Sequence, residues 1–372
     1  MRSSAMRRIG ITGVNGLIGW HLRCRLHALG DVEIILADRQ TFKTDDALQA
    51  FVSRCDGLVH LAGMNRGDDM EVERVNVELA RQLVLALENT DSRPHVVFAS
   101  STHVDRATAY GRSKRAAGDI MKSWSERAGA LFTNLILPHV FGEHGRPFYN
   151  SVVSTFCYQL AVGDIPRIDI DGQLELLHAQ EVAQLVVDSF LQGNKGEVRP
   201  AGYHISVGQM LERLETLSEF YLKRGIIPRL DDMLNLHLFN TFRSYLFPDR
   251  YPWALQLHAD NRGALFEAVK SKQGGQTFFS ITRPGITRGD HFHFDKVERF
   301  LVVSGQGVIR LRRMFDNKIH EFHVDGASPS FIDIPSLHTH NISNTGGGDL
   351  LTLFWAHEIF DPQHPDTFPE KV

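Results

Sequence analysis

Histidines and a glutamate in the second half of the chain form a pattern typical of a metal site. His291 and His293 are two residues apart, and Glu298 follows in the same string, which begins and ends with glycine. Side chains two apart on a β-strand point to the same face, so both imidazoles can reach one point. Glu298 would return on the next strand and His340 on a distant one. Three imidazoles and a carboxylate suit a divalent transition ion such as zinc.

A second set of reactive side chains lies in the first half. Tyr110 and Lys114 are four residues apart, which places them on one face of a helix. A lysine near a tyrosine hydroxyl stabilises the phenolate, so the tyrosine can exchange a proton at a carbonyl oxygen. Ser101, rather than Ser100, ends the strand before this helix and is expected to hold the same oxygen. A Tyr–Lys pair alone is usually a solvated helix face, so its context decides.

That context is a glycine-rich turn between a predicted strand at 8–12 and a predicted helix at 17–29. The first glycine of the turn would allow the tight bend, the second a close approach of pyrophosphate, and the third the helix–strand contact. The free N–H groups of the helix N-terminus would bind the phosphates. The cofactor contacts expected here are Gly13, Asn15, Gly16, Ile18 and Gly19.

The next predicted strand ends in Asp38 and Arg39, where the adenosine ribose of a dinucleotide should lie. An aspartate there favours the free 2′-hydroxyl of NAD, whereas the adjacent arginine can pair with the 2′-phosphate of NADP. Further apolar runs at 57–63 and 95–101 are typical of buried parallel strands. The first half is therefore predicted to be a doubly wound α/β domain that binds a dinucleotide.

Composition limits the class of protein. A chain of 372 residues is too long for one typical core, and its net charge of -4 marks neither a nucleic-acid nor a membrane surface. Three scattered cysteines indicate reduced thiols rather than a disulfide framework. No apolar run is long enough for a signal peptide or a membrane span. We expect a cytoplasmic enzyme that needs no nucleic acid and no membrane.

The pattern changes near residue 248, and we place the domain boundary there, with domains at 1–247 and 248–372. Before it, an amphipathic helical region begins at Val207; its apolar face is expected to pack within the first domain and comprises Met210, Leu211, Leu214 and Leu217. After it, short strands punctuated by glycine predict a closed antiparallel barrel or jelly roll. The predicted strands lie at 276–282, 298–305, 307–313, 330–335 and 349–355.

From Ile9 to about residue 220 the chain resembles the extended short-chain dehydrogenase/reductase family. The resemblance rests on the glycine turn, on L-A-G at 61–63 and on P-H-V-F-G at 138–142. It also includes Asn76, Ser101, Tyr110 and Lys114, and it implies cofactor contacts from Leu61, Ala62, Gly63, Tyr110 and Lys114. His139 stands where the family often has asparagine, and H-A-Q-E at 178–181 replaces the usual strand-end signal; both departures bear on the substrate pocket. Asn150 follows the last of these motifs and is the candidate contact for a uridine or pyrophosphate group.

The second half resembles the cupins. Their first motif matches from Gly285 to Gly305, and their second matches at Gly326, Pro335, His340 and Asn344. The motif assigns the metal ligand to His340 rather than His338. Leu337 stands where glycine is usual, which affects a turn and not a ligand.

Together the two halves resemble the capsular polysaccharide synthesis enzyme (CapF) family over nearly the whole chain. The resemblance implies that the cupin part epimerises a UDP-4-keto-6-deoxy-N-acetylhexosamine at C3. It also implies that the reductase part reduces the C4 ketone with NADPH, giving UDP-N-acetyl-6-deoxy-L-talosamine on the route to UDP-N-acetyl-L-fucosamine. NADPH is favoured over NADH because R-Q-T at 39–41 matches the family. A bound zinc ion and a homodimer are further implications.

Several points stay open at this level. Asp290, His338 and His357 are equivalent candidates for the epimerase base. Zinc could act as a Lewis acid, or four protein ligands could close the site and make it structural. The chain could also be a reductase of another sugar pathway whose cupin only dimerises, or a cofactor-sensing protein without turnover. The complete set of Ser101, Tyr110 and Lys114 argues against the last.

Overall fold

The computed structural model describes residues 8–372, which form two compact units. The first comprises the described residues up to Phe141 together with Gln173–Ile205, and the second comprises Gly142–Gly172 with Ser206–Val372. The expectation of no signal peptide falls partly on residues 1–7, which lie outside the described part. Within residues 8–372 no helix has the length and apolar character needed to cross a bilayer.

The first unit is built on a six-stranded sheet whose paired strands are all parallel. In spatial order the strands are β2 (Glu33–Ala37), β1 (Arg8–Thr12), β3 (Gly57–His60), β4 (His95–Ser101), β5 (Phe132–Leu137) and β8 (Gly196–Val198). A small sheet extends the unit with β6 (His139–Phe141), β7 (Gln173–His178) and β9 (Tyr203–Ser206).

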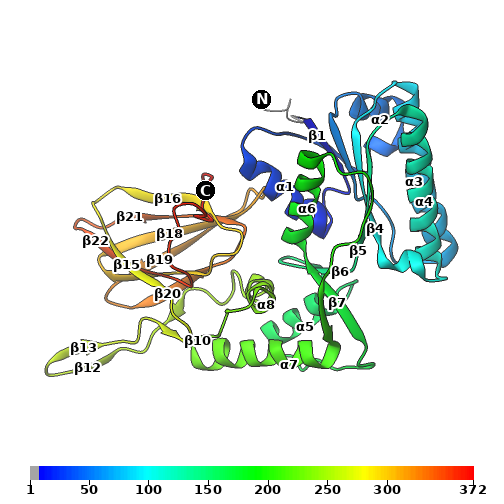
Figure 1. Cartoon of the computed structure of the whole chain (residues 1–372). Helices are drawn as coiled ribbons and strands as arrows, with labels where there is room; N and C mark the ends of the chain where they lie inside the picture. The colour runs from blue at the N-terminus through cyan, green and yellow to red at the C-terminus, as the bar shows by residue number, and fades with distance from the viewer. Residues whose placement is uncertain (1–7) are drawn as a thin grey trace. The chain divides into compact units, whose positions relative to one another are not determined.

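Helices cover both faces of the six-stranded sheet (Figure 1). The helical elements are α1 (Leu17–Leu29), η1 (Thr41–Lys43), α2 (Asp45–Val52), α3 (Asp69–Asn89), η2 (Thr102–Asp105), α4 (Ala109–Ala128) and α6 (Ala179–Gln192). One buried cluster joins α2, α3 and α4 to the sheet through side chains such as Leu83 and Trp124. A second joins α1 and α6 to the opposite face through Leu22 and Val182. The predicted doubly wound α/β fold is confirmed.

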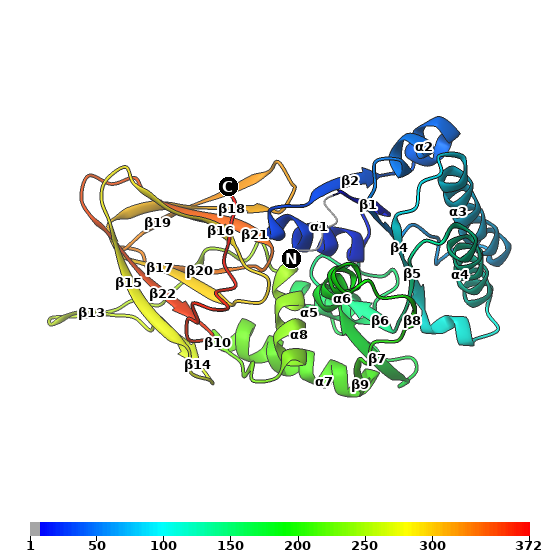
Figure 2. The same cartoon turned by 45° about the horizontal axis from the view of Figure 1, so that its top comes forward.

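The second unit combines three packed helices with a β-barrel. Its helical elements are α5 (Val152–Val162), α7 (Val207–Ser218), η3 (Glu219–Lys223) and α8 (Met233–Ser244). Short strands follow, namely β10 (Ile226–Ile227), β11 (Trp253–Ala254), β12 (His258–Asp260), β13 (Gly263–Leu265) and β14 (Lys270–Ser271). The β12–β13 hairpin projects from the barrel in two views (Figures 1 and 2).

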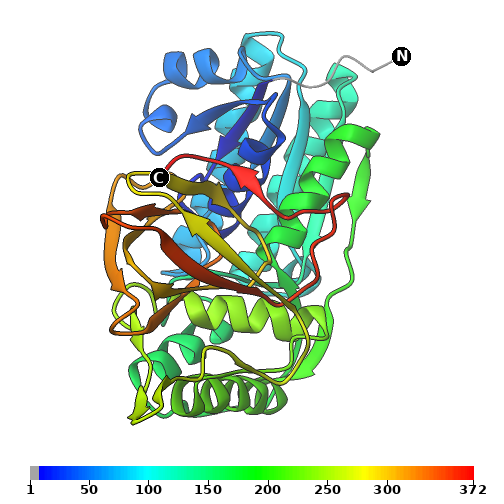
Figure 3. The same ribbon diagram turned by 90° about the vertical axis from the view of Figure 1, so that its left-hand side faces the viewer.

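Two five-stranded antiparallel sheets form the barrel, in the orders β11-β20-β17-β22-β15 and β19-β18-β21-β16-β23. The long strands are β15 (Gln276–Thr282), β16 (Thr287–Phe292), β17 (Glu298–Ser304), β18 (Gln306–Arg313), β19 (Ile319–Asp325), β20 (Ser330–Ile334), β21 (His338–Asn344) and β22 (Leu350–Ala356). The C-terminal strand β23 (Phe368–Pro369), red in Figure 3, lies along the barrel beside β16. The predicted all-β second half is confirmed.

The compact units divide the chain elsewhere than at residue 248. That position marks the change from helices to strands, just after α8 ends. The apolar face of α7 is buried as expected, but it belongs to the unit that contains the barrel. The side chain of Arg243 on α8 donates to the carbonyl oxygen of Ile334 in β20. These helices therefore fold with the strands and not with the dinucleotide-binding sheet.

A buried ion pair between two barrel strands also binds Tyr221 of η3, and so connects the helices of the second unit to the barrel. The Arg299 guanidinium makes two hydrogen bonds to the Asp333 carboxylate, at 2.7 and 2.8 Å, and both side chains are almost fully buried. The Tyr221 hydroxyl donates to the same carboxylate at 2.6 Å and lies 2.7 Å from the Tyr251 hydroxyl. The guanidinium also lies 3.5 Å from the centre of the Phe331 ring.

Replacing Asp333 with asparagine should destabilise this unit strongly. The Asp333→Asn change leaves the buried guanidinium without a counter-charge, so we expect the free energy of unfolding to fall by about 3–5 kcal/mol. Glu321→Gln is the matched control, because it removes one charge from the exposed Arg310–Glu321 pair of the same barrel. That change should cost less than about 1 kcal/mol in urea unfolding followed by tryptophan fluorescence. Equal losses for both variants would contradict the assigned role.

Candidate active site and metal centre

The glycine turn of the first unit packs too closely against neighbouring backbone to accept side chains. Gly13 has a φ of 71°, and a Cβ atom there would lie 2.7 Å from the backbone nitrogen of Ala62. A Cβ at Gly19 would lie 2.4 Å from the carbonyl oxygen of Gly13. Gly16 is the N-cap of α1 and supplies no side-chain cap, and no acidic side chain is present in the first turn. The positive end of α1 is thus left for an anion, as a dinucleotide requires.

Two further predicted cofactor contacts of the glycine turn are at least partly exposed to solvent. Asn15 is exposed, and Ile18 is half-buried in the first turn of α1. Leu61 and Ala62 are half-buried and Gly63 is exposed at the carboxyl end of β3. The structure therefore brings the predicted cofactor residues of β1, α1 and β3 to one edge of the sheet.

Thr12, which sequence reasoning missed, ties two of these segments together. Its buried hydroxyl oxygen accepts hydrogen bonds from the N–H groups of Leu61 and Ala62, both at 3.1 Å. It also lies 2.9 Å from Nδ1 of His60. Burial, with the charge of Lys114, lowers the pKa of His60 to about 3, so its neutral Nδ1 can accept the threonine proton. The sequence signal was a polar residue at the end of an apolar strand.

The carboxylate of Asp38 is hydrogen-bonded within its own loop. Its Oδ1 accepts the N–H groups of Gln40 and Thr41, at 2.8 and 3.1 Å. These backbone hydrogen bonds lower the pKa of Asp38. Arg39 beside it is exposed. One carboxylate oxygen of Asp38 is therefore already hydrogen-bonded within the loop, whereas Arg39 is exposed to solvent.

Asn76 on α3 fixes the chain just beyond β3. Its amide accepts from the N–H of Met64 at 2.6 Å and donates to the carbonyl oxygen of Met64 at 2.8 Å. It also donates to the hydroxyl of Ser113 on α4. A Cβ at Gly63 would lie 3.0 Å from this amide oxygen. Asn76 thus holds the L-A-G segment against the helix that carries Tyr110 and Lys114.

The three predicted reductase residues meet at the carboxyl end of β4 and the first turns of α4. Ser101 ends β4, and its Oγ accepts the N–H of His103 at 3.3 Å, which leaves its own proton free to be donated to a ligand. Lys114 is buried and donates to the carbonyl oxygen of Ala99 at 2.8 Å. Its Nζ lies 5.9 Å from the centre of the Tyr110 ring. The side chains are grouped as expected, but the lysine bonds to the backbone and not directly to the tyrosine.

Two histidines adjoin this group. The ring of His103 packs edge-on against Tyr110 with centroids 5.7 Å apart. His139 follows Leu137, which pairs with Ser101 across β4 and β5. Burial, then the charge of His103, lowers the pKa of His139, and its buried Nε2 has no partner within residues 8–372. His103 was not predicted, because a single histidine in a short helical turn carries no sequence signal.

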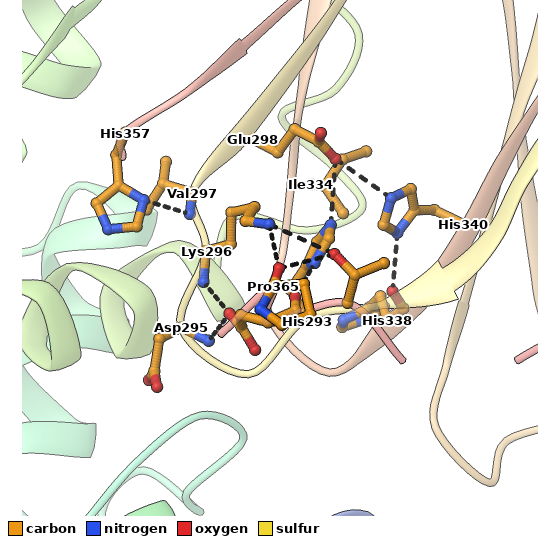
Figure 4. Close-up of polar contacts among 12 residues, drawn as sticks. His293, Asp295, Lys296, Val297, Glu298, Ile334, His338, His340, His357 and Pro365 are labelled. Carbon is orange, nitrogen blue, oxygen red and sulfur yellow. Dashed lines mark hydrogen bonds and ion pairs between the residues drawn. The ribbon is translucent and has the colours of Figure 1, made fainter. Parts of the chain in front are cut away.

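The four predicted metal ligands converge inside the barrel. The ligand atoms of His291, His293, Glu298 and His340 all lie within 4.8 Å of one another. Nε2 of His293 and Nε2 of His340 lie 3.2 and 3.4 Å from Oε2 of Glu298. Figure 4 shows Glu298 and His340 facing each other, with His293 below. A backbone irregularity between Gly289 and His291 brings His291 opposite His340.

These distances fit a zinc ion. Ligands about 2.0 Å from zinc in a tetrahedron lie roughly 3.3 Å apart, close to the two separations given above. Nδ1 of His293 faces the carbonyl oxygen of Asp366, and Nδ1 of His340 faces that of His338. Because a carbonyl oxygen can only accept, each Nδ1 carries the proton and each Nε2 has its lone pair available.

The electrostatics of the group also suit a cation. Burial, then the charges of His340 and His293, lowers the pKa of His291 to about 3, so this ring is neutral at physiological pH. Burial acts to raise the pKa of Glu298, but its interactions with the adjacent His293 and His340 outweigh burial and lower that pKa. Three of the four side chains are buried and His291 is half-buried.

An aromatic wall borders the metal centre. Phe300 packs edge-on against His340, and Phe354 packs edge-on against Phe300, with centroids 5.4 and 4.5 Å apart. Phe278 stacks on Phe354 at 5.0 Å and is 41% exposed. The wall therefore runs from solvent to the ligands.

The three candidate bases differ in environment. His338 is buried and packs against Phe247, with ring centroids 4.7 Å apart, which suits a packing role rather than contact with a substrate. His357 accepts the N–H of Val297 through Nδ1, and burial lowers its pKa to about 4. Asp290 accepts the side-chain amide of Asn341 at 2.8 Å.

Two further residues singled out from the sequence, Leu337 and Asn150, lie in the second unit. Leu337, where cupins usually have glycine, has a φ of 60°, so a buried leucine occupies a left-handed turn that favours glycine. Asn150 is exposed and precedes α5, in the second unit.

Both halves of the chain match known protein families. Residues 9–206 match the model of the NAD dependent epimerase/dehydratase family, and residues 258–368 match the Polysaccharide biosynthesis C-terminal domain. The capsular polysaccharide assembling protein CapF from Staphylococcus aureus is 32% identical, with a TM-score of 0.64 over 98% of this chain and 100% of that one. The chain belongs to the CapF family.

Two other relatives complete the comparison. UDP-2-acetamido-2,6-beta-L-arabino-hexul-4-ose reductase from Pseudomonas aeruginosa strain PA103 is 32% identical over 375 residues, covering 98% of this chain and 99% of that protein. UDP-N-acetylglucosamine 4-epimerase from Bacillus cereus is 17% identical, with a TM-score of 0.54 over 65% of this chain and 96% of that one. At 17% identity, the likeness to the Bacillus cereus enzyme supports only a shared fold.

Proposed function

We propose that this member of the CapF family is a bifunctional enzyme acting on a UDP-linked 4-keto sugar in capsular or surface polysaccharide synthesis. Its barrel would epimerise a UDP-4-keto-6-deoxy-N-acetylhexosamine at C3. Its first unit would then reduce the C4 ketone with NADPH, giving UDP-N-acetyl-6-deoxy-L-talosamine. The reductase named as the Pseudomonas aeruginosa relative supports the reductase half.

One observation carries the proposal: a complete Ser101, Tyr110 and Lys114 set adjoins a glycine turn that can take pyrophosphate, in the same chain as a four-ligand metal centre. Dinucleotide contacts would come from the glycine turn and the L-A-G segment. We assign NADPH because Arg39 is exposed for a 2′-phosphate, while one oxygen of Asp38 is already engaged in its loop. When bound, the reduced nicotinamide supplies a hydride.

In the reduction, Tyr110 protonates the C4 oxygen. Burial raises the pKa of Tyr110 to about 12, so the free enzyme holds it as a neutral phenol, ready to donate. The hydroxyl of Ser101 would donate to the same oxygen and align it. Burial also lowers the pKa of Lys114 to about 8, so near neutral pH it is largely an ammonium whose charge stabilises the phenolate left after proton transfer.

In the epimerisation, the ketone acidifies the proton at C3, so the barrel needs a base, an acid on the other face and stabilisation of the enolate oxygen. Zinc, when bound, supplies that stabilisation as a Lewis acid. His291, His293, Glu298 and His340 would hold it. Asp290 and His357 stay candidates for the base, and the wall from Phe278 to Phe300 gives the pocket an apolar side.

A second candidate is a keto-sugar reductase of another pathway with a structural cupin. The four protein ligands favour it, because structural zinc sites usually have four while catalytic sites keep an open position. C3 exchange distinguishes the two, since a structural metal would leave no exchange activity in the barrel.

We also propose a homodimer formed through the barrel. Within residues 8–372, β15 pairs with β22 alone, and its outward side chains Phe279 and Ile281 are both 60% exposed. The projecting β12–β13 hairpin exposes Leu265, and an isolated two-stranded hairpin is at best marginally stable. A second copy would cover the open strand edge and the hairpin.

The two half-reactions should separate by mutation. The wild-type enzyme, given UDP-4-keto-6-deoxyhexosamines and NADPH in deuterated water, should incorporate deuterium at C3 and reduce C4. Tyr110→Phe should slow reduction by about 10²- to 10⁴-fold and retain C3 exchange, because its proton donor is lost. Glu298→Gln should lose exchange and retain NADPH oxidation with a C3-epimerised substrate. Undiminished reduction by Tyr110→Phe would overturn the proton-donor assignment, and reduction of C4 by the wild type without any C3 exchange would favour the second candidate.

The reduction rate should depend on the charge of Lys114. With its pKa lowered to about 8, the ammonium is lost as pH rises through 8, so kcat/KM for reduction should fall above that pH. Lys114→Arg keeps its charge at high pH and should be slower but no longer show this fall. Stopped-flow NADPH oxidation between pH 6 and 10 measures both, and an identical fall in both proteins would assign it to another group.

The dimer should depend on the edge of β15. Ile281→Asp places a charge on the proposed interface, so light scattering after size exclusion should show a monomer. Ile319→Asp is the matched control, since Ile319 is 44% exposed on β19, the edge strand of the other sheet. A dimer in both variants, or a monomeric wild type, would contradict the proposed interface.

A further inference from the structure

A C-terminal strap, defined here as residues 365–367, crosses the loop that carries one metal ligand. The carboxylate of Asp366 accepts three consecutive backbone N–H groups, those of Phe294, Asp295 and Lys296, at 2.9, 2.9 and 2.8 Å. The loop between β16 and β17 therefore wraps around one carboxylate, immediately after His293.

The same residue also contacts the ligand itself. The backbone carbonyl oxygen of Asp366 accepts Nδ1–H of His293, as described above. This bond fixes the tautomer and the rotation of the ring, so that Nε2 points at the centre. Asp366 thus holds both the backbone and the side chain of His293.

A buried lysine holds the strap in place from the other side. The ammonium of Lys296 donates to the carbonyl oxygen of Pro365 at 2.6 Å and to Oγ1 of Thr367 at 3.4 Å, and its side chain is almost fully buried. Figure 4 shows Lys296 bonded to Pro365 beside His293. The loop donates all of these hydrogen bonds and the strap accepts them, and together they resist rotation of the imidazole.

We propose that Asp366 is a positioning residue for the metal centre, setting the orientation of His293 through its carbonyl oxygen and the shape of the ligand loop through its carboxylate. The proposal rests on the proposed metal site but not on the epimerase chemistry. It gives the F-D-P-Q-H-P-D-T segment at 360–367 a role that the metal motif does not assign.

Asp366→Asn is a sharp test because it changes little else. Asp366 has a φ of 40°, and asparagine tolerates the left-handed region about as well as aspartate. The amide has the same shape, but its NH₂ group must face at least one of the three N–H donors in either orientation. The loop therefore loses a bond and gains a repulsive contact while the backbone conformation remains available.

The experiment is a zinc titration of the full-length protein against a chromophoric chelator, with the thermal midpoint of the metal-free protein measured in parallel. Asp366→Asn keeps the carbonyl oxygen that bonds to His293 but loosens the loop that carries the ring, so zinc should bind about 10-fold more weakly, the lower end of the range for outer partners of metal-bound histidines. The visible spectrum of the cobalt-substituted variant should also shift, because the histidine is reoriented.

Asp361→Asn is the matched control, since Asp361 in the same segment bonds only within its own turn, to the N–H of Gln363 and to the ring of His364. It should keep wild-type zinc affinity. Equal affinities for wild type and Asp366→Asn, even with a lower thermal midpoint, would overturn the positioning role and leave the metal site intact. Failure of wild type to bind zinc would overturn both.

If Asp366→Asn does not fold, Lys296→Met carries the test. Methionine fills the buried space of the lysine stem but removes both bonds to the strap, so zinc binding should weaken. Wild-type affinity in Lys296→Met would then overturn the proposal.

Discussion

Successive side chains of strand β17 point to opposite sides, so this strand links the metal centre to the buried ion pair of the second unit. Glu298 begins β17 and faces into the barrel, and Arg299, the next residue, faces outward to Asp333. A buried guanidinium is tolerated only when its charge is paired and its donors are satisfied, so the position of β17 is tightly constrained. The carboxylate that meets the histidines is held in place by its neighbour's ion pair, which the helical segment completes through Tyr221.

Much of this arrangement was predictable because it depends on local pattern. The strand at 8–12, the helix at 17–29 and the strand at 276–282 have the predicted bounds, since apolar periodicity and glycine turns determine them within a few residues. The four metal ligands also converge as predicted. Two of them share a strand region, and the cupin spacing places the others. The grouping of Ser101, Tyr110 and Lys114 follows from the parallel sheet and the helical spacing of four.

Other features depend on contacts between distant residues, which no local pattern encodes. Thr12 and Asp366 act through backbone groups about 50 and 70 positions away, and backbone groups have no sequence signature. The compact units also differ from the predicted division at residue 248, for a related reason. A change from helices to strands suggests a new domain, but the bonds of Arg243 and Tyr221 to β20 are visible only in the fold. The helical spacing likewise predicted that Lys114 lies near Tyr110, but not its hydrogen bond to the carbonyl oxygen of Ala99.

The connectivity of the two units has an evolutionary and practical consequence. The chain passes between them at 141–142, 172–173 and 205–206, so each unit is assembled from two separate stretches. The crossings at 141–142 and 172–173 lie within the match to the NAD dependent epimerase/dehydratase family, and the third precedes the match to the C-terminal domain. One fusion junction after residue 206 is therefore compatible with all three crossings. Neither compact unit can be excised as a single continuous fragment. If residues 206–372 were exchanged between relatives in one recombination event, the 142–172 segment would pack against foreign helices.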